Sequence, residues 1–222
     1  MHISNHPLAL HSIMCSIGGF LGGYAILTRF GNLGAAQTSN MIELVLDFVG
    51  RNYADFALRI IGFILYASAF VLVTYLSKQT DLSMQRYAIS IDIAGMIILS
   101  LIPADVNPII GLLPLFFMMS TQWSVFHGFG EYNSSTIFST NNLRQLTISL
   151  TEYCMEHEPK KLIRAKFFGN SLLWYHVGAA VSFFACKYFA VHGVLCALPA
   201  AAAALVLTLE CRILPVTHPK KA

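Results

Sequence analysis

Charged side chains are scarce in this sequence. Asp, Glu, Lys and Arg together make up 11% of the 222 residues, whereas 56% of the residues are hydrophobic. A soluble domain usually carries about 25% charged residues, so this chain has too few charges to cover a surface that faces water. We therefore expect an integral membrane protein with the lipid bilayer as its solvent. The modest net charge of +3 gives no reason to expect a nucleic acid partner.

Sequence patterns of catalytic and metal-binding sites are also missing. The chain has no HExxH, no nucleophile elbow and no acid pair with a nearby base, so we predict that it is not an enzyme. The five cysteines show no CxxC spacing, which favours packing roles. Glu152, Glu156 and His157 cluster beside Lys160 and Lys161, which is more typical of a charged turn than of a metal site. We expect neither a metal nor a cofactor.

Long apolar runs are what the sequence has in place of charge. Crossing a bilayer takes roughly 20 apolar residues in a helix. Six runs are candidate spans, namely Pro7–Thr28, Phe56–Ser77, Tyr87–Ile102, Pro108–Phe129, Phe167–Lys187 and Phe189–Leu209. No basic residue precedes the first run, so we expect a span there rather than a cleavable signal peptide. No low-complexity linker divides the chain, and we expect a single membrane domain over residues 1–222.

The basic residues predict how these spans are oriented. With the N-terminus inside, the cytoplasmic segments would hold Lys78, Arg86, Arg144, Lys160, Lys161, Arg164, Lys166, Arg212, Lys220 and Lys221. The outer segments would hold Arg29, Arg51, Arg59 and Lys187. Because Lys and Arg concentrate in cytoplasmic loops, this bias predicts that both termini are cytoplasmic.

Two short polar segments stand between the apolar runs. They are Gln37-Thr38-Ser39-Asn40 and Ser139-Thr140-Asn141-Asn142, and we call them the polar motifs. When one is aligned with the other, Thr38 matches Thr140 and Asn40 matches Asn142. The helical stretches that follow them, 41–50 and 143–153, are about 16 Å long at 1.5 Å per residue, too short to cross a bilayer. We expect two short half-helices there.

The duplicated motif predicts an internal repeat. The halves 7–105 and 106–212 would each contain three spans, so the second half would enter the membrane upside down. Inverted repeats of this kind are common in transporters, where the solute site lies between the repeats near the middle of the bilayer. We therefore predict an all-α membrane fold with six spans, two short half-helices and an inverted 3+3 arrangement.

The residue types in the motifs fit a solute site, but they also fit a simpler role. Ser, Thr and Asn accept hydrogen bonds from the free N–H groups at a helix start. Two helix starts that point inward would favour an anionic or strongly hydrogen-bonding solute. The same residues could also serve only to cap buried helix ends, since an unpaired backbone group in lipid costs several kcal/mol.

Three further features lie within the predicted spans. Asp92 is an ionisable residue in the third span, where such groups usually face the interior, and we expect it to couple transport to protons or cations. The alternative is a position near the membrane edge, where Asp92 would be attracted to Arg86. Gln122 in the fourth span would bind the solute or another helix. Gly18, Gly19, Gly22 and Gly23 form overlapping GxxxG patterns, which indicate close helix packing within the chain or a homodimer.

The motifs and their neighbours also carry a family resemblance. The first signature comprises Gly19-Phe20-Leu21, Tyr24 and the motif at 37–40, and the second comprises Gln122-Trp123, Phe126 and the run 132–145. Together they resemble the YoaK-like family of bacterial inner-membrane proteins, which carry a domain of unknown function. The resemblance implies about six spans and the inner membrane, but no substrate. Many relatives have Thr-Gly-Asn at the motifs, and many have an acid where Gly22 stands here.

These observations lead to a small-solute transporter or permease as the first hypothesis. Its path would be lined by both polar motifs, Gln122 and Asp92, with Asp92 as the coupling residue. A passive channel with the same pore is the second hypothesis. A membrane interaction or scaffold protein, in which the motifs only cap helices and the glycines form a contact face, is the third.

Overall fold

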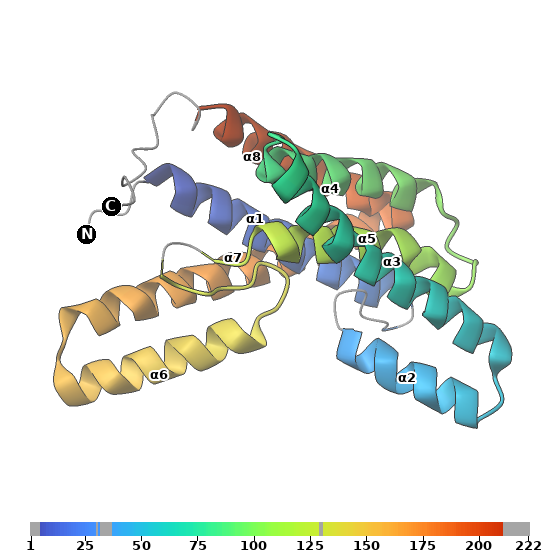
Figure 1. Cartoon of the computed structure of the whole chain (residues 1–222), viewed down its shortest axis with the longest axis horizontal. Coiled ribbons are helices and arrows are strands. Elements are labelled where there is room, and N and C mark those ends of the chain that lie inside the picture. Colours follow the sequence, from blue (N-terminus) through green and yellow to red (C-terminus); the bar gives the residue numbers. More distant parts are fainter. Residues whose placement is uncertain (1–4, 30, 32–36, 129–130, 211–222) are drawn as a thin grey trace.

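The computed structural model describes residues 5–29, 31, 37–128 and 131–210, and its regular elements are all helices (Figure 1). The elements are α1 (Asn5–Thr28), α2 (Gln37–Val49), α3 (Tyr53–Gln79), α4 (Met84–Leu101), α5 (Pro108–Val125), α6 (Thr140–Glu156), α7 (Pro159–Phe189), the 3₁₀ helix η1 (Ala190–Ala197) and α8 (Leu198–Glu210). The predicted all-α class is therefore confirmed. Phe129 and the residues after 210, which the predictions also included, lie outside the described residues.

The helices are long and apolar enough for a membrane protein. Five candidate spans meet both criteria, namely Pro7–Thr28, Tyr53–Gln79, Met84–Leu101, Pro108–Val125 and Pro159–Leu209. The last one covers α7, η1 and α8. Within it the backbone reverses at Ala190, which has a φ of 50°, and Gly193 of η1 packs against the backbone of Ala185 in α7. In Figure 1, α8 consequently runs back beside α1 and α4.

One helix start differs clearly from the predicted span. The apolar run begins at Phe167, but α7 begins at Pro159 and includes three basic residues in its first two turns. Proline is favoured at the first helical position because its fixed φ suits a helix and its missing N–H needs no partner there. Hydropathy marked the apolar part of this helix, while Pro159 determines where the helix begins.

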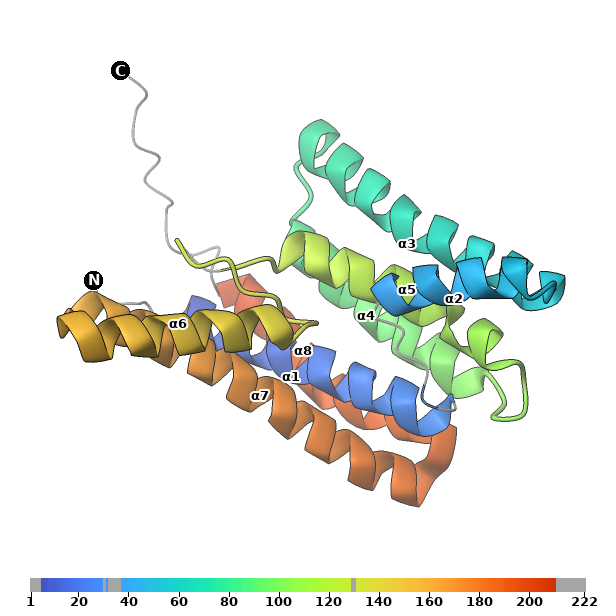
Figure 2. The same ribbon diagram turned by 90° about the horizontal axis from the view of Figure 1, so that it is seen from below.

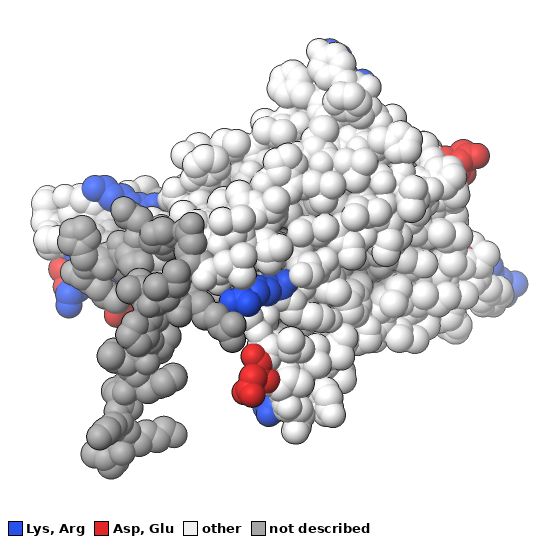
Figure 3. Space-filling view, turned by 90° about the horizontal axis from the view of Figure 1, so that it is seen from above, with Lys and Arg blue, Asp and Glu red and all other residues white. Residues whose placement is uncertain are grey.

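The outer surface is largely apolar. On α3 the side chains of Val71 and Tyr75 are 69% and 60% exposed, and on α7 those of Leu173 and Tyr188 are 61% and 71% exposed. Figure 3 shows one face of the molecule, and the charged side chains visible on it lie mostly near its edges. Large apolar side chains that point outward on several helices are expected where the surrounding solvent is lipid.

The centre of the molecule is built on α1, which packs along α7 at close range. A Cβ atom on Gly19 would collide with the backbone oxygen of Tyr175, and one on Gly178 would collide with that of Ser16. Gly23 lies against the hydroxyl of Ser182 in the same way. Small residues let two helix backbones approach closely in a membrane. Gly19 and Gly23 of α1 therefore allow close packing of two helices within one chain.

The two predicted short helices are present, and each pairs with the helix that follows it. α2 has 13 residues and packs on α3, while α6 has 17 residues and packs on α7. At 1.5 Å per residue they are about 20 and 26 Å long, less than the roughly 30 Å of a bilayer core. Both helices start at or inside the polar motifs, at Gln37 and Thr140, rather than after them. The α2–α3 pair and the α6–α7 pair are two helical hairpins, and they extend toward opposite ends of the molecule (Figure 1).

Candidate functional site

Residues from both polar motifs line one cavity, which we call the central cavity. Its volume is about 870 Å³, within the range of roughly 300 to 1,000 Å³ that is common for ligand sites. Its walls are formed by Gln37, Thr38, Met41, Phe63, Tyr66, Ala67, Phe70, Trp123, Phe138, Thr140, Asn141 and Arg144. Segments from the two halves of the chain thus contribute to the same space.

The first turns of α2 and α6 point toward each other across this space. The views in Figures 1 and 2 agree that the two N-terminal ends face the middle of the molecule, whereas the C-terminal ends point outward. Ser139, the residue before α6, makes no capping hydrogen bond with its side chain. The first N–H groups of a helix lack partners inside the helix and carry a partial positive charge. The N-terminal ends of α2 and α6 therefore direct two partial positive charges at the cavity.

Four of the eight motif residues are in the cavity wall. Gln37 and Thr38 come from α2, and Thr140 and Asn141 come from α6. The side-chain nitrogen of Gln37 is buried and has no hydrogen-bond partner among the described residues. Ser39 is exposed outside the wall, and Ser139 lies beside it at the start of α6. The wall residues leave hydrogen-bonding capacity for a bound molecule.

Asn142, which the sequence predicts to bind the solute, is not in the cavity wall and forms its hydrogen bonds within the protein. The residue is fully buried, and its Oδ1 accepts hydrogen bonds from Ser134 Oγ at 3.0 Å and Ser135 N at 3.3 Å. Its Nδ2 donates to the carbonyl oxygens of Ser135 at 2.7 Å and Phe138 at 3.3 Å. An amide side chain can accept two hydrogen bonds and donate two. All four are used here, so Asn142 holds the chain that leads into α6.

Asn40 likewise faces the protein rather than the cavity. Its Oδ1 accepts a hydrogen bond of 3.4 Å from Arg59 of α3. Arg59 also forms ion pairs with Glu43 at 2.5 Å and with Asp47 at 2.7 Å. This network joins α2 to α3, and it engages both acidic side chains of α2.

Gln122 lies buried behind the cavity, next to Trp123 in its wall. Its Nε2 donates to the carbonyl oxygen of Met14 at 2.9 Å and to Thr136 Oγ1 at 3.0 Å. These bonds tie α5 to α1 and to the non-helical segment 133–139. Its Oε1 has no hydrogen-bond partner among the described residues. Of the two roles expected for Gln122, contact with neighbouring elements is the one these bonds serve.

Asp92 is separate from the central cavity. It is fully buried on the inner face of α4, between Ile89 and Met96, and it is not in the cavity wall. Neither carboxylate oxygen has a hydrogen-bond partner among the described residues. A charged carboxylate in this place would lack compensation, which is energetically costly. The carboxyl group faces the protein interior, as the sequence analysis expects of an ionisable residue in a span.

His11 is a buried polar residue that the sequence analysis did not single out. Its Nε2 lies 3.1 Å from Ser134 Oγ and 3.2 Å from Ser171 Oγ, and its ring stacks on Phe167 at 5.2 Å. The contacts join α1, the segment before α6, and α7. An ionisable group inside an apolar run was the available signal. Its partners are far away in the sequence and could not be identified from it.

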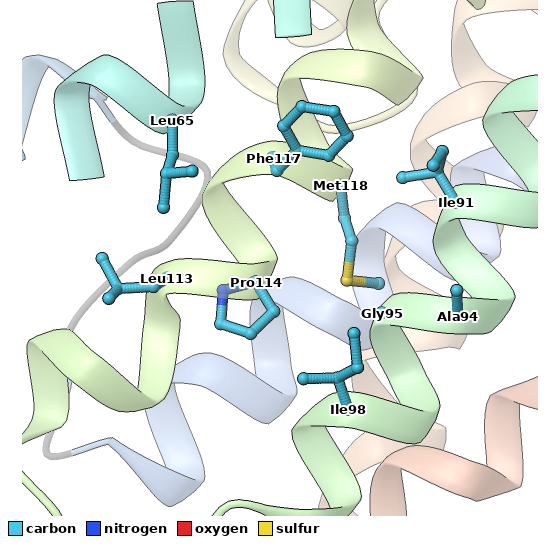
Figure 4. Close-up of a pocket in the computed structure, with 9 residues that line it drawn as sticks. All are labelled: Leu65, Ile91, Ala94, Gly95, Ile98, Leu113, Pro114, Phe117 and Met118. Atoms are coloured by element: carbon cyan, nitrogen blue, oxygen red, sulfur yellow. The ribbon is translucent and has the colours of Figure 1, made fainter. Parts of the chain in front are cut away.

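A second cavity differs from the central cavity in having an entirely apolar lining. It has a volume of about 330 Å³ and is lined by Leu65, Ile91, Ala94, Gly95, Ile98, Leu113, Pro114, Phe117 and Met118. Figure 4 shows these residues on α3, α4 and α5, with Met118 reaching the place where Gly95 has no side chain. None of these residues is charged or has a polar side chain, so this cavity suits apolar groups, whereas the central cavity offers both apolar and polar contacts.

The four hydrogen bonds of Asn142 yield a stability prediction. Asn142→Ala should lower the free energy of unfolding by more than about 2 kcal/mol, because it removes the partners of the buried N–H and carbonyl groups of Ser135. Asn141→Ala is the matched control, since Asn141 makes one exposed bond, to the carbonyl oxygen of Asn133. Thermal unfolding in detergent measures both variants, and equal stability of the two would contradict this role.

Comparisons with known proteins place the chain in a family. No curated protein and no solved structure matches it. Residues 10–209 match a family that is described only as a protein of unknown function, and this match spans α1 to α8 apart from a few terminal residues. The YoaK-like name stays a prediction, because the match does not include it. On this match over most of its length, the chain belongs to the DUF1275 family of proteins of unknown function.

Proposed function

We propose that the protein is a small-solute transporter or permease whose path passes through the central cavity. The observation that carries this proposal is that the starts of two short helices, from different halves of the chain, line the same cavity. Solute sites in many transporters lie between repeats, where the ends of interrupted helices face the solute. A capping role alone would not require the two motifs to share a cavity.

The proposal includes an inverted repeat with six spans. Its halves are 7–105 and 106–212, so that α1, α2, α3 and α4 correspond to α5, α6, α7 and the η1–α8 unit. The helix contacts support this pairing. α1 packs on α7 as α5 packs on α3, and α2 packs on α3 as α6 packs on α7. α4 contacts α5 as α8 contacts α1, so exchanging the halves preserves these contacts.

One pair of contacts refines the alignment of the halves. Arg59 pairs with Glu43, and Arg164 donates a hydrogen bond of 2.5 Å to Gln145, the residue that aligns with Glu43. Arg164 is therefore the counterpart of Arg59 in the second half of the chain. α6 has 17 residues and α2 has 13, so α6 extends further past its motif, and this shifts the register of the sequences.

The membrane orientation forms part of the same proposal. The excess of Lys and Arg in alternate loops supports two cytoplasmic termini. Glu152 and Lys161 pair at 2.9 Å in the α6–α7 hairpin, which this orientation places on the cytoplasmic side. The family resemblance at the motifs supports the bacterial inner membrane as the location.

Two other functions remain alternatives with distinct expectations. A passive channel would use the same cavity but show flux that follows the solute gradient alone. A scaffold protein would carry no solute, and its contact face would include Gly18, Gly19, Gly22 and Gly23 in a homodimer. The contacts of Gly19 and Gly23 with α7 within the chain favour the first two functions over the third.

Blocking the cavity should stop transport. Thr140→Trp places a large side chain in the wall, and Thr147→Trp, an exposed position two turns along α6, is the matched control. Proteoliposomes are incubated with a mixture of small organic acids, amino acids and sugars, and uptake is quantified by mass spectrometry. At least one component should enter with the wild type and Thr147→Trp but not with Thr140→Trp. Equal uptake by both variants would exclude this path.

Asp92 provides the test of coupling. Because its unpaired carboxyl group is buried, a change of protonation there should depend on a change of conformation. Asp92→Asn keeps the shape of the side chain but cannot release a proton, so uptake should lose its dependence on an imposed pH gradient while the protein still folds. Asp81→Asn, on an exposed loop, is the control. An unchanged dependence in Asp92→Asn would exclude this coupling role.

A further inference from the structure

The wall of the central cavity includes several hydrogen-bond donors. Arg144 contributes a guanidinium group, and Gln37 contributes a buried side-chain nitrogen without a partner. Tyr66 is only 6% exposed, and its hydroxyl group also lacks a partner among the described residues. An unpaired buried polar group costs about 1–3 kcal/mol, so a ligand that accepts hydrogen bonds would relieve this cost.

The charges around the cavity favour an anion. None of the described residues that line it is acidic. The acids of α2, Glu43 and Asp47, pair with Arg59, and no described carboxylate is paired with Arg144. Arg144 follows Thr140 by one helical turn and therefore lies on the same face of α6. The N-terminal ends of α2 and α6 add two partial positive charges directed at the same space.

The remaining wall is apolar and largely aromatic. The ring of Trp123 contacts Phe70 and Phe138, with centroids 5.7 and 5.1 Å apart, and Phe70 contacts Tyr66 at 5.2 Å. These four rings come from α3, α5 and the segment before α6, and they form a continuous wall. Such a surface offers favourable contacts to a flat or apolar body. A small hydrophilic anion such as phosphate would leave it unused.

We propose that the central cavity binds an amphipathic organic carboxylate, with the carboxylate near Arg144 and the helix starts and the apolar body against the aromatic wall. This inference rests on the cavity assigned under the proposed function and specifies its substrate class. It requires binding alone, and it is tested separately from transport. A membrane lipid with an anionic headgroup is the competing source of the same chemistry.

The sequence provides a fluorescent reporter for this site. The chain has two tryptophans, Trp123 in the cavity wall and Trp174 on α7. In a Trp174→Phe background, fluorescence of purified protein in nanodiscs of zwitterionic lipid reports on the cavity. Phenylacetate is the probe, and the neutral phenylacetamide and the cationic phenethylamine are its controls. Phenylacetate should change the emission saturably and far more strongly than the other two.

Variants of the donors make the test specific. Arg144→Gln should weaken phenylacetate binding about tenfold or more, which corresponds to about 1.4 kcal/mol. Lys78→Gln removes an exposed charge at the end of α3, away from the cavity, and should leave binding unchanged. Tyr66→Phe should weaken binding several-fold without lowering thermal stability, because the hydroxyl group has no partner to lose.

Each outcome decides between specific possibilities. An equal response to phenylacetamide, or an unchanged affinity in Arg144→Gln, would overturn the carboxylate proposal. Loss of the response when nanodiscs contain phosphatidylglycerol would assign the donors to a lipid headgroup and also overturn it. Binding without uptake in proteoliposomes would refute transport but support the anion site. If Thr140→Trp blocks an uptake that is confined to neutral solutes, transport through the cavity would be supported and the anion site would be refuted.

Discussion

Backbone polar groups that are withdrawn from water must find partners within the protein, and the centre of this structure is organised by that constraint. Segment 133–139 is non-helical, and Ser134, Ser135 and Thr136 within it are buried. In lipid such a segment is tolerated only where protein surrounds it or where it lines a cavity. The side-chain amide of Asn142 forms four hydrogen bonds with this segment. Gln122 bonds to the hydroxyl group of Thr136 in the segment, and His11 bonds to that of Ser134.

This arrangement determines where α6 begins. Because the segment is held in the interior, the first turn of α6 lies at the central cavity. α2 enters the same cavity from the other half of the chain and is fixed on α3 by Arg59. Two short helices then present their positive ends, unpaired donors and an aromatic wall to one space.

Much of the fold could be predicted from the sequence because it depends on local patterns. Apolar runs located the long helices, and Pro108 marked the start of α5 correctly. The two polar motifs indicated short helices that meet at one site. The roles of Asn142 and Asn40 could not be predicted, because their partners are determined by tertiary contacts. Residue type alone did not distinguish an asparagine that binds a solute from one that supports a buried segment.

The sequence also did not indicate which residues come together in the cavity wall. Tyr66 looks like an ordinary span residue in the sequence, and Arg144 looks like a marker of topology. Trp123 and Phe138 belong to the second signature, which indicates no role for their rings. Their shared location follows from the packing of α3 on α5 and from the path of segment 133–139. His11 and Ser171 are 160 residues apart, yet they are 3.2 Å apart in space. Contacts over such separations have no local signal that a single sequence can reveal.

The central claim is that α2 and α6 meet at the cavity, and cross-linking in the membrane tests it most directly. In a background without the five native cysteines, Thr38→Cys is combined with Thr140→Cys, or with Thr151→Cys near the far end of α6. A short bis-maleimide is added to the protein in lipid, and linked peptides are identified by mass spectrometry. The account predicts a link within one chain between positions 38 and 140 and none between 38 and 151. Absence of the first link, or equal formation of both, would contradict it.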